Sequence, residues 1–223
     1  MSALVFVELD EGQVKKSSLE AVSYASDVDS AVAAIVFGEA GEADVKAIGA
    51  AGATKILHVA EDKLSQPNIM AYSRAVAEAM EQEGADLLVM AKSSFGDPIA
   101  ARIAVKTKAS LVSNVAELPD TSNGFVVKRS IYTGKAFAQT LVTGDRKVLT
   151  LKKNASMIKE DQGDAEVAAF APALDDNDFA VTVTKREKAT GDVLLPEADI
   201  VVSGGRGLKG PENWGVIEDL AKE

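Results

Sequence analysis

Residues 86–118 read DLLVMAKSSFGDPIAARIAVKTKASLVSNVAEL and carry a strand pattern, a helix pattern and a second strand pattern in succession. Asp86–Ala91 is a short apolar run, which is typical of a strand buried on both faces of a parallel sheet. We expect Asp97-Pro98 to form the N-cap and first residue of a helix that ends near Lys106. Leu111–Leu118 then reads as the next strand. This order predicts a βα repeat with parallel strands.

The same pattern occurs three times upstream of this stretch. The expected strands are Ala3–Leu9, Ala31–Phe37 and Thr54–Ala60, and the expected helices are Ser17–Ser26, Glu42–Ala51 and Pro67–Glu83. Pro67 and Gly84 occupy the places of a first-turn proline and a glycine that ends a helix. Four such units followed by a further strand predict an α/β fold. Its sheet is doubly wound and mostly parallel, Rossmann-like and of the nucleotide-binding type.

Beyond Pro119 the apolar runs follow one another at short spacing. Asn123-Gly124 is a hairpin-type turn, and three runs after it predict an antiparallel β extension in the form of a meander: Phe125–Tyr132, Ala136–Val142 and Lys147–Leu151. Glu160–Glu166 is acidic and reads as an exposed loop. Val167–Phe170 and Phe179–Lys185 are expected to be two more short strands.

A βα pattern restarts near the C-terminal end of the chain, with Ile200–Ser203 as a strand and a helix from about Pro211 to Lys222. We therefore expect an N-terminal α/β domain over residues 1–190, a linker over 191–197 and the beginning of a second α/β domain over 198–223. A lone strand and helix cannot bury their apolar faces, so this second domain is expected to be truncated.

Composition excludes several classes of site. The 223 residues are 47% hydrophobic and 26% charged with a net charge of −10, and such an acidic surface disfavours nucleic acid as a partner. The absence of cysteine excludes disulfides, thiolate metal sites and cysteine nucleophiles, and a single histidine excludes metal sites that need two. No apolar run approaches the ~20 residues of a membrane span, and the first ten residues lack the basic start of a targeting peptide. We expect a cytoplasmic bacterial protein without membrane insertion.

The first candidate binding site is the glycine-rich turn SGGRG, formed by Ser203, Gly204, Gly205, Arg206 and Gly207. Glycines let the backbone approach a ligand, and N–H groups at the start of a helix favour an anion. Arg206 adds a permanent charge with a donor fork. The turn is neither G-x-G-x-x-G nor a Walker motif. From this pattern alone, a tight turn without a ligand is the more common interpretation.

The second candidate is Lys92–Pro98 (KSSFGDP), at the expected carboxyl end of a strand. Ser93 and Ser94 could donate to a phosphate there. We favour a loop capped by Asp97, because no base or cation is evidently placed to activate the serines. His58 is expected to be a hydrogen-bonded strand residue, since no sequence-local partner orients it for catalysis.

Three segments resemble the α subunit of the electron transfer flavoprotein family, in the order of that subunit. Asp199–Trp214 (DIVVSGGRGLKGPENW) is similar to its V-V-S-G-G-R-G-[LM]-K-x-x-E-N-[FW] segment. Lys128–Ala138 (KRSIYTGKAFA) resembles its R-x-I-Y-x-G-x-A hairpin, and residues 86–118 resemble its first-domain stretch A-x-S-x-x-G…R-x-A. The resemblance extends along the whole chain and covers about the first two-thirds of such a subunit.

This resemblance implies an FAD-containing heterodimer with a β subunit, in which the β subunit buries an AMP. It implies an electron carrier and not a substrate-converting enzyme. The electrons would come from acyl-CoA and related dehydrogenases, as in fatty acid β-oxidation, and pass to a quinone oxidoreductase or another acceptor. Arg206 matches the family's FAD-contacting arginine, and the residues around it match the shape of the turn. Residues 1–190 would contact the partner subunit.

The family's later motifs, which supply most FAD contacts, fall outside the 223 residues. We therefore expect residues 1–223 by themselves to lack bound FAD. One alternative is an α/β module that binds a partner and has no cofactor of its own. Another is a hydrolase or transferase that uses the Ser93–Asp97 edge, which is weaker because that edge lacks an evident base.

Overall fold

The computed structural model describes residues 2–64, 66–185, 198 and 200–223. The chain divides into two compact units, Met1–Thr182 (unit 1) and Val183–Glu223 (unit 2). The expected linker over 191–197 lies outside the described residues, so the domain limits given above stay a prediction. Within the described part of the chain, no helix is long and apolar enough to cross a membrane.

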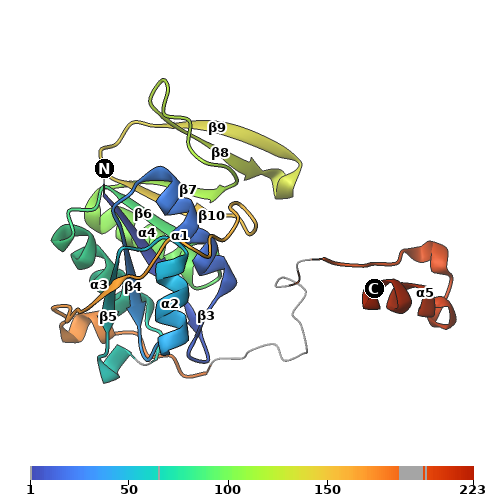
Figure 1. Ribbon diagram of the computed structural model, residues 1–223, viewed down its shortest axis with the longest axis horizontal. Helices are drawn as coiled ribbons and strands as arrows, with labels where there is room; N and C mark the ends of the chain where they lie inside the picture. Colours follow the sequence, from blue (N-terminus) through green and yellow to red (C-terminus); the bar gives the residue numbers. More distant parts are fainter. Residues whose placement is uncertain (1, 65, 186–197, 199) are drawn as a thin grey trace. The chain divides into compact units, whose positions relative to one another are not determined.

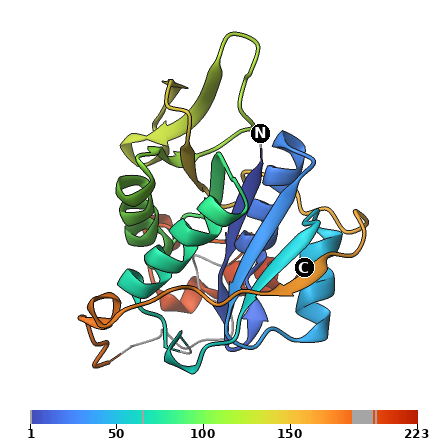
Figure 2. The same cartoon turned by 90° about the vertical axis from the view of Figure 1, so that its left-hand side faces the viewer.

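Unit 1 is built on a nine-stranded sheet with the order β11-β5-β4-β1-β6-β10-β7-β8-β9 (Figures 1 and 2). The parallel strands are β1 (Ala3–Val7), β4 (Val32–Phe37), β5 (Lys55–Val59), β6 (Leu87–Ala91), β7 (Ser110–Val115), β10 (Lys147–Leu151) and β11 (Glu166–Ala169). The hairpin of β8 (Phe125–Ile131) and β9 (Ala136–Val142) is antiparallel, and β2 (Leu9–Asp10) and β3 (Gln13–Val14) form a separate small sheet. The prediction of a doubly wound, mostly parallel sheet with an antiparallel extension is confirmed.

Helices cover both faces of this sheet. The side chains of α1 (Lys16–Val28) and α2 (Glu42–Ala50) pack into one apolar core, and those of α3 (Ile69–Gln82) and α4 (Gly96–Thr107) pack into the other. Alternate residues of β1 point into the two cores, and all five are buried. This double burial explains why the central strands read as continuous apolar runs in the sequence.

Two expected helix starts are wrong. In each helix, a residue other than the expected one accepts hydrogen bonds from the first free N–H groups. The cap of α3 is Asn68, whose Oδ1 accepts from the N–H groups of Met70 at 2.9 Å and Ala71 at 3.3 Å, so Pro67 precedes the helix. Helix α4 begins at Gly96, before Asp97, and the Gly96 N–H donates to the Ser93 hydroxyl at 2.7 Å. The glycine expected to end α3 is confirmed, since Gly84 has a left-handed φ of 62°.

The largest correction concerns Lys147–Leu151. This segment is a strand, but it is not the third strand of an antiparallel meander: β10 lies between β6 and β7 and is parallel to both. Four of its five residues are buried, with Val148 and Leu149 in opposite cores. A run that is apolar on both faces needs a sheet neighbour on each side and a helix layer above and below, and only the middle of the sheet provides these.

Phe179–Lys185 is not a strand. A 3₁₀ turn, η3 (Asp176–Phe179), occupies its start, and the Asp175 carboxylate caps this turn by accepting the Asn177 N–H at 2.8 Å. Val181 and Val183 are exposed. A segment with alternating valines forms a strand only where another strand is available to pair with it. No such strand lies beside these residues in the described part of the chain.

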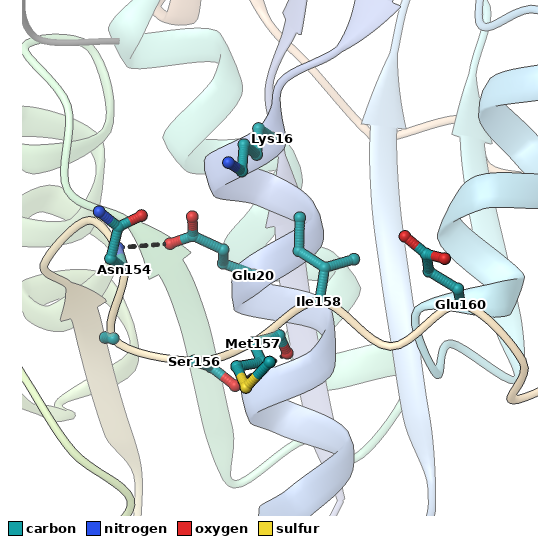
Figure 3. A pocket seen from close by; sticks show the side chains of 8 residues that line it. Lys16, Glu20, Asn154, Ser156, Met157, Ile158 and Glu160 are labelled. Carbon is teal, nitrogen blue, oxygen red and sulfur yellow. Dashed lines mark hydrogen bonds between the residues drawn. The ribbon is translucent and has the colours of Figure 1, made fainter. Parts of the chain in front are cut away.

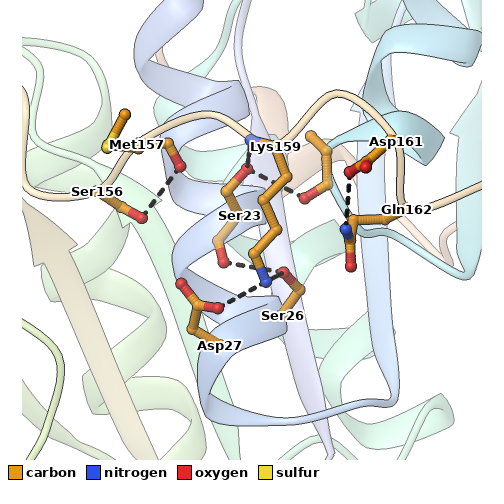
Figure 4. Close-up of polar contacts among 9 residues, drawn as sticks. Ser23, Ser26, Asp27, Ser156, Met157, Lys159, Asp161 and Gln162 are labelled. Atoms are coloured by element: carbon orange, nitrogen blue, oxygen red, sulfur yellow. Dashed lines mark hydrogen bonds and ion pairs between the residues drawn. The ribbon is translucent and has the colours of Figure 1, made fainter.

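Residues 152–165 form a strap that runs from β10 to β11 across α1 and α2 (Figure 4). The Lys159 N–H donates to the Ser23 hydroxyl at 2.9 Å, and the Lys159 ammonium lies 2.6 Å from the Asp27 carboxylate. Gly49 of α2 allows the close crossing, since a Cβ there would lie 2.8 Å from the Ala165 nitrogen. The strap contains most of the acidic segment 160–166, whose side chains are largely exposed, as predicted.

Tyr24 provides a test of this packing. It is fully buried on α1, its hydroxyl donates to the Glu117 carbonyl at 3.0 Å, and burial raises the pKa of the phenol. The folded state therefore resists ionisation, so stability is complete below the unfolded pKa of about 10 and falls as the pH rises above it. In Tyr24→Phe, we expect a loss of about 1 kcal/mol at pH 7, from the hydrogen bond, and a shallower alkaline decline than in the wild type.

Urea unfolding at neutral and alkaline pH measures both effects. Tyr132→Phe is the matched control, because this tyrosine is 77% exposed. An alkaline decline in Tyr24→Phe as steep as that of the wild type would show that the buried phenol does not control it.

Candidate functional site

The turn Ser203–Gly207 lies in unit 2, and its residues Arg206 and Gly207 begin a short 3₁₀ helix, η5 (Arg206–Leu208). Gly204 is packed tightly, because a Cβ there would lie 2.1 Å from Leu208 Cδ1 and 3.2 Å from Trp214 Cζ3. Only glycine fits this position without displacing both neighbours.

The other half of the turn is open. A Cβ at Gly205 or Gly207 would meet no heavy atom within 4 Å. Arg206 is exposed and forms no ion pair with any residue that the structure describes. The turn therefore combines one tightly packed glycine, two accessible ones and an exposed guanidinium, which suits the approach of an anionic or electron-rich ligand.

The elements that flank this turn differ from those expected. Ile200–Ser203 is not a strand: Ile200 and Val201 are exposed, and no strand pairs with them among the described residues. The expected helix from Pro211 begins as a 3₁₀ turn, η6 (Pro211–Asn213), and continues as α5 (Gly215–Lys222). Val216 and Leu220 of α5 are exposed as well. The turn thus owes its shape to local contacts, not to a sheet.

The second candidate, Lys92–Pro98, lies in unit 1 at the carboxyl ends of β1 and β6, which are neighbours in the sheet. The Ser93 hydroxyl donates to the Glu8 carboxylate at 2.5 Å and accepts the Gly96 N–H. Lys92 pairs with Asp97 at 3.0 Å, and Ser94 is exposed. Ser93 is thus engaged as both donor and acceptor within the chain, which supports a structural role and weakens the hydrolase or transferase hypothesis.

Sequence reasoning missed Glu8 as the partner of Ser93, because 85 positions separate the two residues. The one available signal was an acidic residue directly after a fully apolar strand. The prediction for His58 is confirmed: it lies in β5, and its Nε2 is 2.7 Å from the carbonyl of Gly38, which directly follows the neighbouring strand β4. The described residues contain no cluster of side chains that could hold a metal ion.

A cleft of about 450 Å³ lies beside the first turns of α1 (Figure 3). Lys16 and Glu20 of α1 and residues 154–158 and 160 of the strap line it. The Glu20 carboxylate is buried and accepts the Asn154 N–H at 2.8 Å, so its evident role is to anchor the strap. Nothing in the sequence indicated this cleft, since its walls come from segments about 130 residues apart.

The hairpin of β8 and β9 lies at one edge of the sheet (Figure 1). One face of β9 carries exposed apolar side chains. Phe137 and Leu141 alternate on β9, and their side chains are 52% and 55% exposed. Lys128 of β8 lies on the same face, with its ammonium 4.8 Å from the centre of the Phe137 ring and in an ion pair with Glu117. We call Phe137, Leu141 and Lys128 the hairpin face.

Comparison with known sequences identifies the family that this chain resembles. The sequence model described as "Electron transfer flavoprotein domain" matches residues 3–175. The protein named electron transfer flavoprotein subunit alpha of Syntrophomonas wolfei is 30% identical over 97% of this chain and 69% of its own length. The proteins of the same name from Mycobacterium tuberculosis H37Rv and Bacillus subtilis are 35% and 26% identical, each over 98% of this chain and 68% of their own lengths.

Proposed function

This chain belongs to the electron transfer flavoprotein family, and we propose that it acts as the α subunit of an FAD-containing heterodimer. The heterodimer carries electrons from acyl-CoA and related dehydrogenases to a quinone oxidoreductase or another acceptor, and its β subunit holds an AMP. The chain is an electron carrier and not an enzyme with a substrate of its own. A cytoplasmic location in a bacterium is part of the same proposal.

The observation that carries this proposal is the SGGRG turn, whose arginine forms no ion pair with the residues that the structure describes. Bound FAD accepts electrons and passes them on, and its reduction builds up negative charge. Arg206 is exposed, permanently charged and free of any described acidic partner, so its guanidinium can donate to the flavin and favour that charge. Gly205 and Gly207 leave the backbone open to a ligand, and Gly204 allows the close packing of Leu208 and Trp214 against the turn. Ser203 is included because it is the first residue of the SGGRG match.

We assign the contact with the β subunit to unit 1, through the hairpin face. Phe137 and Leu141 present apolar surface on an edge strand, which is costly to leave in water and is typical of a surface that another protein covers. The opposite edge of the sheet, β11, offers a comparison, because its Val167 is 49% exposed.

Co-purification with the β subunit from the same genome tests this assignment. We expect Leu141→Asp to abolish association, because it places a charge on the apolar surface that the β subunit would cover. Val167→Asp, the same kind of change at the opposite edge, should leave association intact. Equal retention by both variants would contradict the hairpin assignment, whereas failure of the unaltered chain to associate would contradict the subunit proposal itself.

A second candidate function is a partner-binding module with no cofactor of its own. The self-contained polar contacts of Glu8 and Ser93 favour it for unit 1, since they occupy the edge where an α/β fold usually takes a ligand. The visible absorption spectrum of the complex separates the two functions when the α subunit is expressed as its genome encodes it, and not as residues 1–223 alone: bound flavin supports the carrier, and its absence supports the module.

A further inference from the structure

The carboxyl ends of β1 and β6 mark the point at which the sheet reverses its direction of growth. From β1 the chain builds β4 and then β5 on one side, and it then crosses to place β6 on the other side. The helices that follow β1 and β6 lie on opposite faces of the sheet. Doubly wound folds bind ligands, often nucleotide phosphates, at this switch point.

In this chain, the side chain of Glu8 occupies the switch point. Glu8 follows β1 directly and is only 6% exposed. Its Oε1 accepts from the Ser93 hydroxyl at 2.5 Å, and its Oε2 lies 3.0 Å from the Lys15 ammonium. A Cβ on Gly96, the first residue of α4, would lie 3.1 Å from Glu8 Oε1. The carboxylate therefore stands at the positive end of α4, where a bound anion would otherwise be stabilised.

The first βα turn is closed as well. A glycine-rich turn would leave its N–H groups free for a phosphate, but here the small hairpin of β2 and β3 fills this connection. The Glu8 N–H donates to the Ser18 hydroxyl at 2.9 Å, and the Lys15 N–H donates to the Glu8 carbonyl at 3.1 Å. Both ends of the turn are thus engaged within the chain.

The charges at this edge are also balanced without a ligand. Lys15 is paired with Glu8, and Lys92, which follows β6, is paired with Asp97 in the first turn of α4. An entering phosphate would meet two carboxylates and find both lysines already paired. Its repulsion by Glu8 would be strong, because Glu8 is buried and only weakly screened by water.

We propose that the Glu8 carboxylate occupies the place at the switch point where a bound anion would lie. It thereby prevents unit 1 from binding nucleotide phosphates. Glu8 is thereby a specificity-determining residue: it converts a nucleotide-binding type of fold into a scaffold. This inference concerns unit 1 alone and does not depend on flavin binding by the proposed heterodimer.

The proposal predicts that removal of the Glu8 side chain creates an anion site. Glu8→Ala leaves Ser93, Lys15 and the start of α4 without their carboxylate, so the variant should melt at a lower temperature than the wild type. Acetate or inorganic phosphate should restore part of the loss, with a rise of about 3–5 °C at ten times the dissociation constant. The wild type should show no such rise relative to sodium chloride of the same ionic strength.

Asp10→Ala is the control, since it removes the same charge two residues further on, in β2. It should respond to phosphate as the wild type does. Calorimetric titration with AMP then tests the nucleotide directly: binding at least tenfold tighter to Glu8→Ala than to the wild type supports the proposal.

Glu8→Gln covers the case in which the alanine variant does not fold. Glutamine keeps the volume and can still accept from Ser93, but it releases Lys15 from its ion pair and removes the repulsion. Phosphate should therefore raise its melting temperature more than that of the wild type. If the folded variants respond to phosphate, acetate and AMP no more than the wild type and Asp10→Ala do, Glu8 does not occupy an anion site and the proposal is wrong.

Discussion

Replacement of Leu149 by alanine should lower the free energy of unfolding by about 2–5 kcal/mol. Leu149 is fully buried in the middle of β10, and its side chain belongs to the core beneath α1 and α2. β10 has a parallel neighbour on each side, so the surrounding backbone cannot collapse into the cavity left by the missing atoms. Because little repacking can offset the cavity, the free energy of unfolding should fall by nearly the full cost of the missing side chain.

The same substitution at Leu141 separates the observed topology from the expected meander. Leu141 lies on the edge strand β9 and is 55% exposed, so Leu141→Ala should cost less than about 0.5 kcal/mol. Urea unfolding of both variants measures the difference in the free energy of unfolding, and equal m-values would show that the two curves can be compared directly. Similar small losses would mean that β10 lies at an edge, as a meander would place it.

The position of β10 shows which features of the fold can be predicted from local sequence patterns and which cannot. Each βα unit is a local object: its strand, helix and turn lie within about 30 residues, and burial of both strand faces is visible as a continuous apolar run. The order of strands in the sheet is not local. β10 follows the hairpin in the chain but enters the sheet between β6 and β7. Residues 148–151 of β10 are all buried, whereas half-buried and exposed residues alternate along most of β9, and this difference follows from the strand order.

The two incorrect strands, Phe179–Lys185 and Ile200–Ser203, have the opposite explanation. Both are apolar enough to pair, but a strand exists only where a second strand offers its free N–H and C=O groups. In the described residues, neither segment has such a neighbour. The SGGRG turn was predictable because its shape depends on contacts within about ten residues, between Gly204, Leu208 and Trp214. The pair of Glu8 and Ser93 was not, because the sheet alone brings them together.

Replacement of Arg206 by alanine should lower the reduction potential of the flavin in the proposed heterodimer while the flavin stays bound. A hydrogen bond to a charged group contributes about 1.5–3 kcal/mol, which corresponds to about 30–60 mV for a two-electron couple. The sign follows from the charge: a fixed guanidinium stabilises the reduced, more negative flavin more than the oxidised one. Without it, reduction becomes less favourable and the potential falls.

Spectroelectrochemistry of the two-subunit protein measures this shift, and Lys209→Ala controls for it. Lys209 is exposed three residues further along the same segment, so its removal changes the net charge equally without removing a donor from the turn. Arg206→Lys should retain part of the potential, because the charge remains while the fork of donors is lost. A shift in Arg206→Ala no larger than that in Lys209→Ala would mean that long-range charge explains the potential and that the Arg206 guanidinium does not contact the flavin.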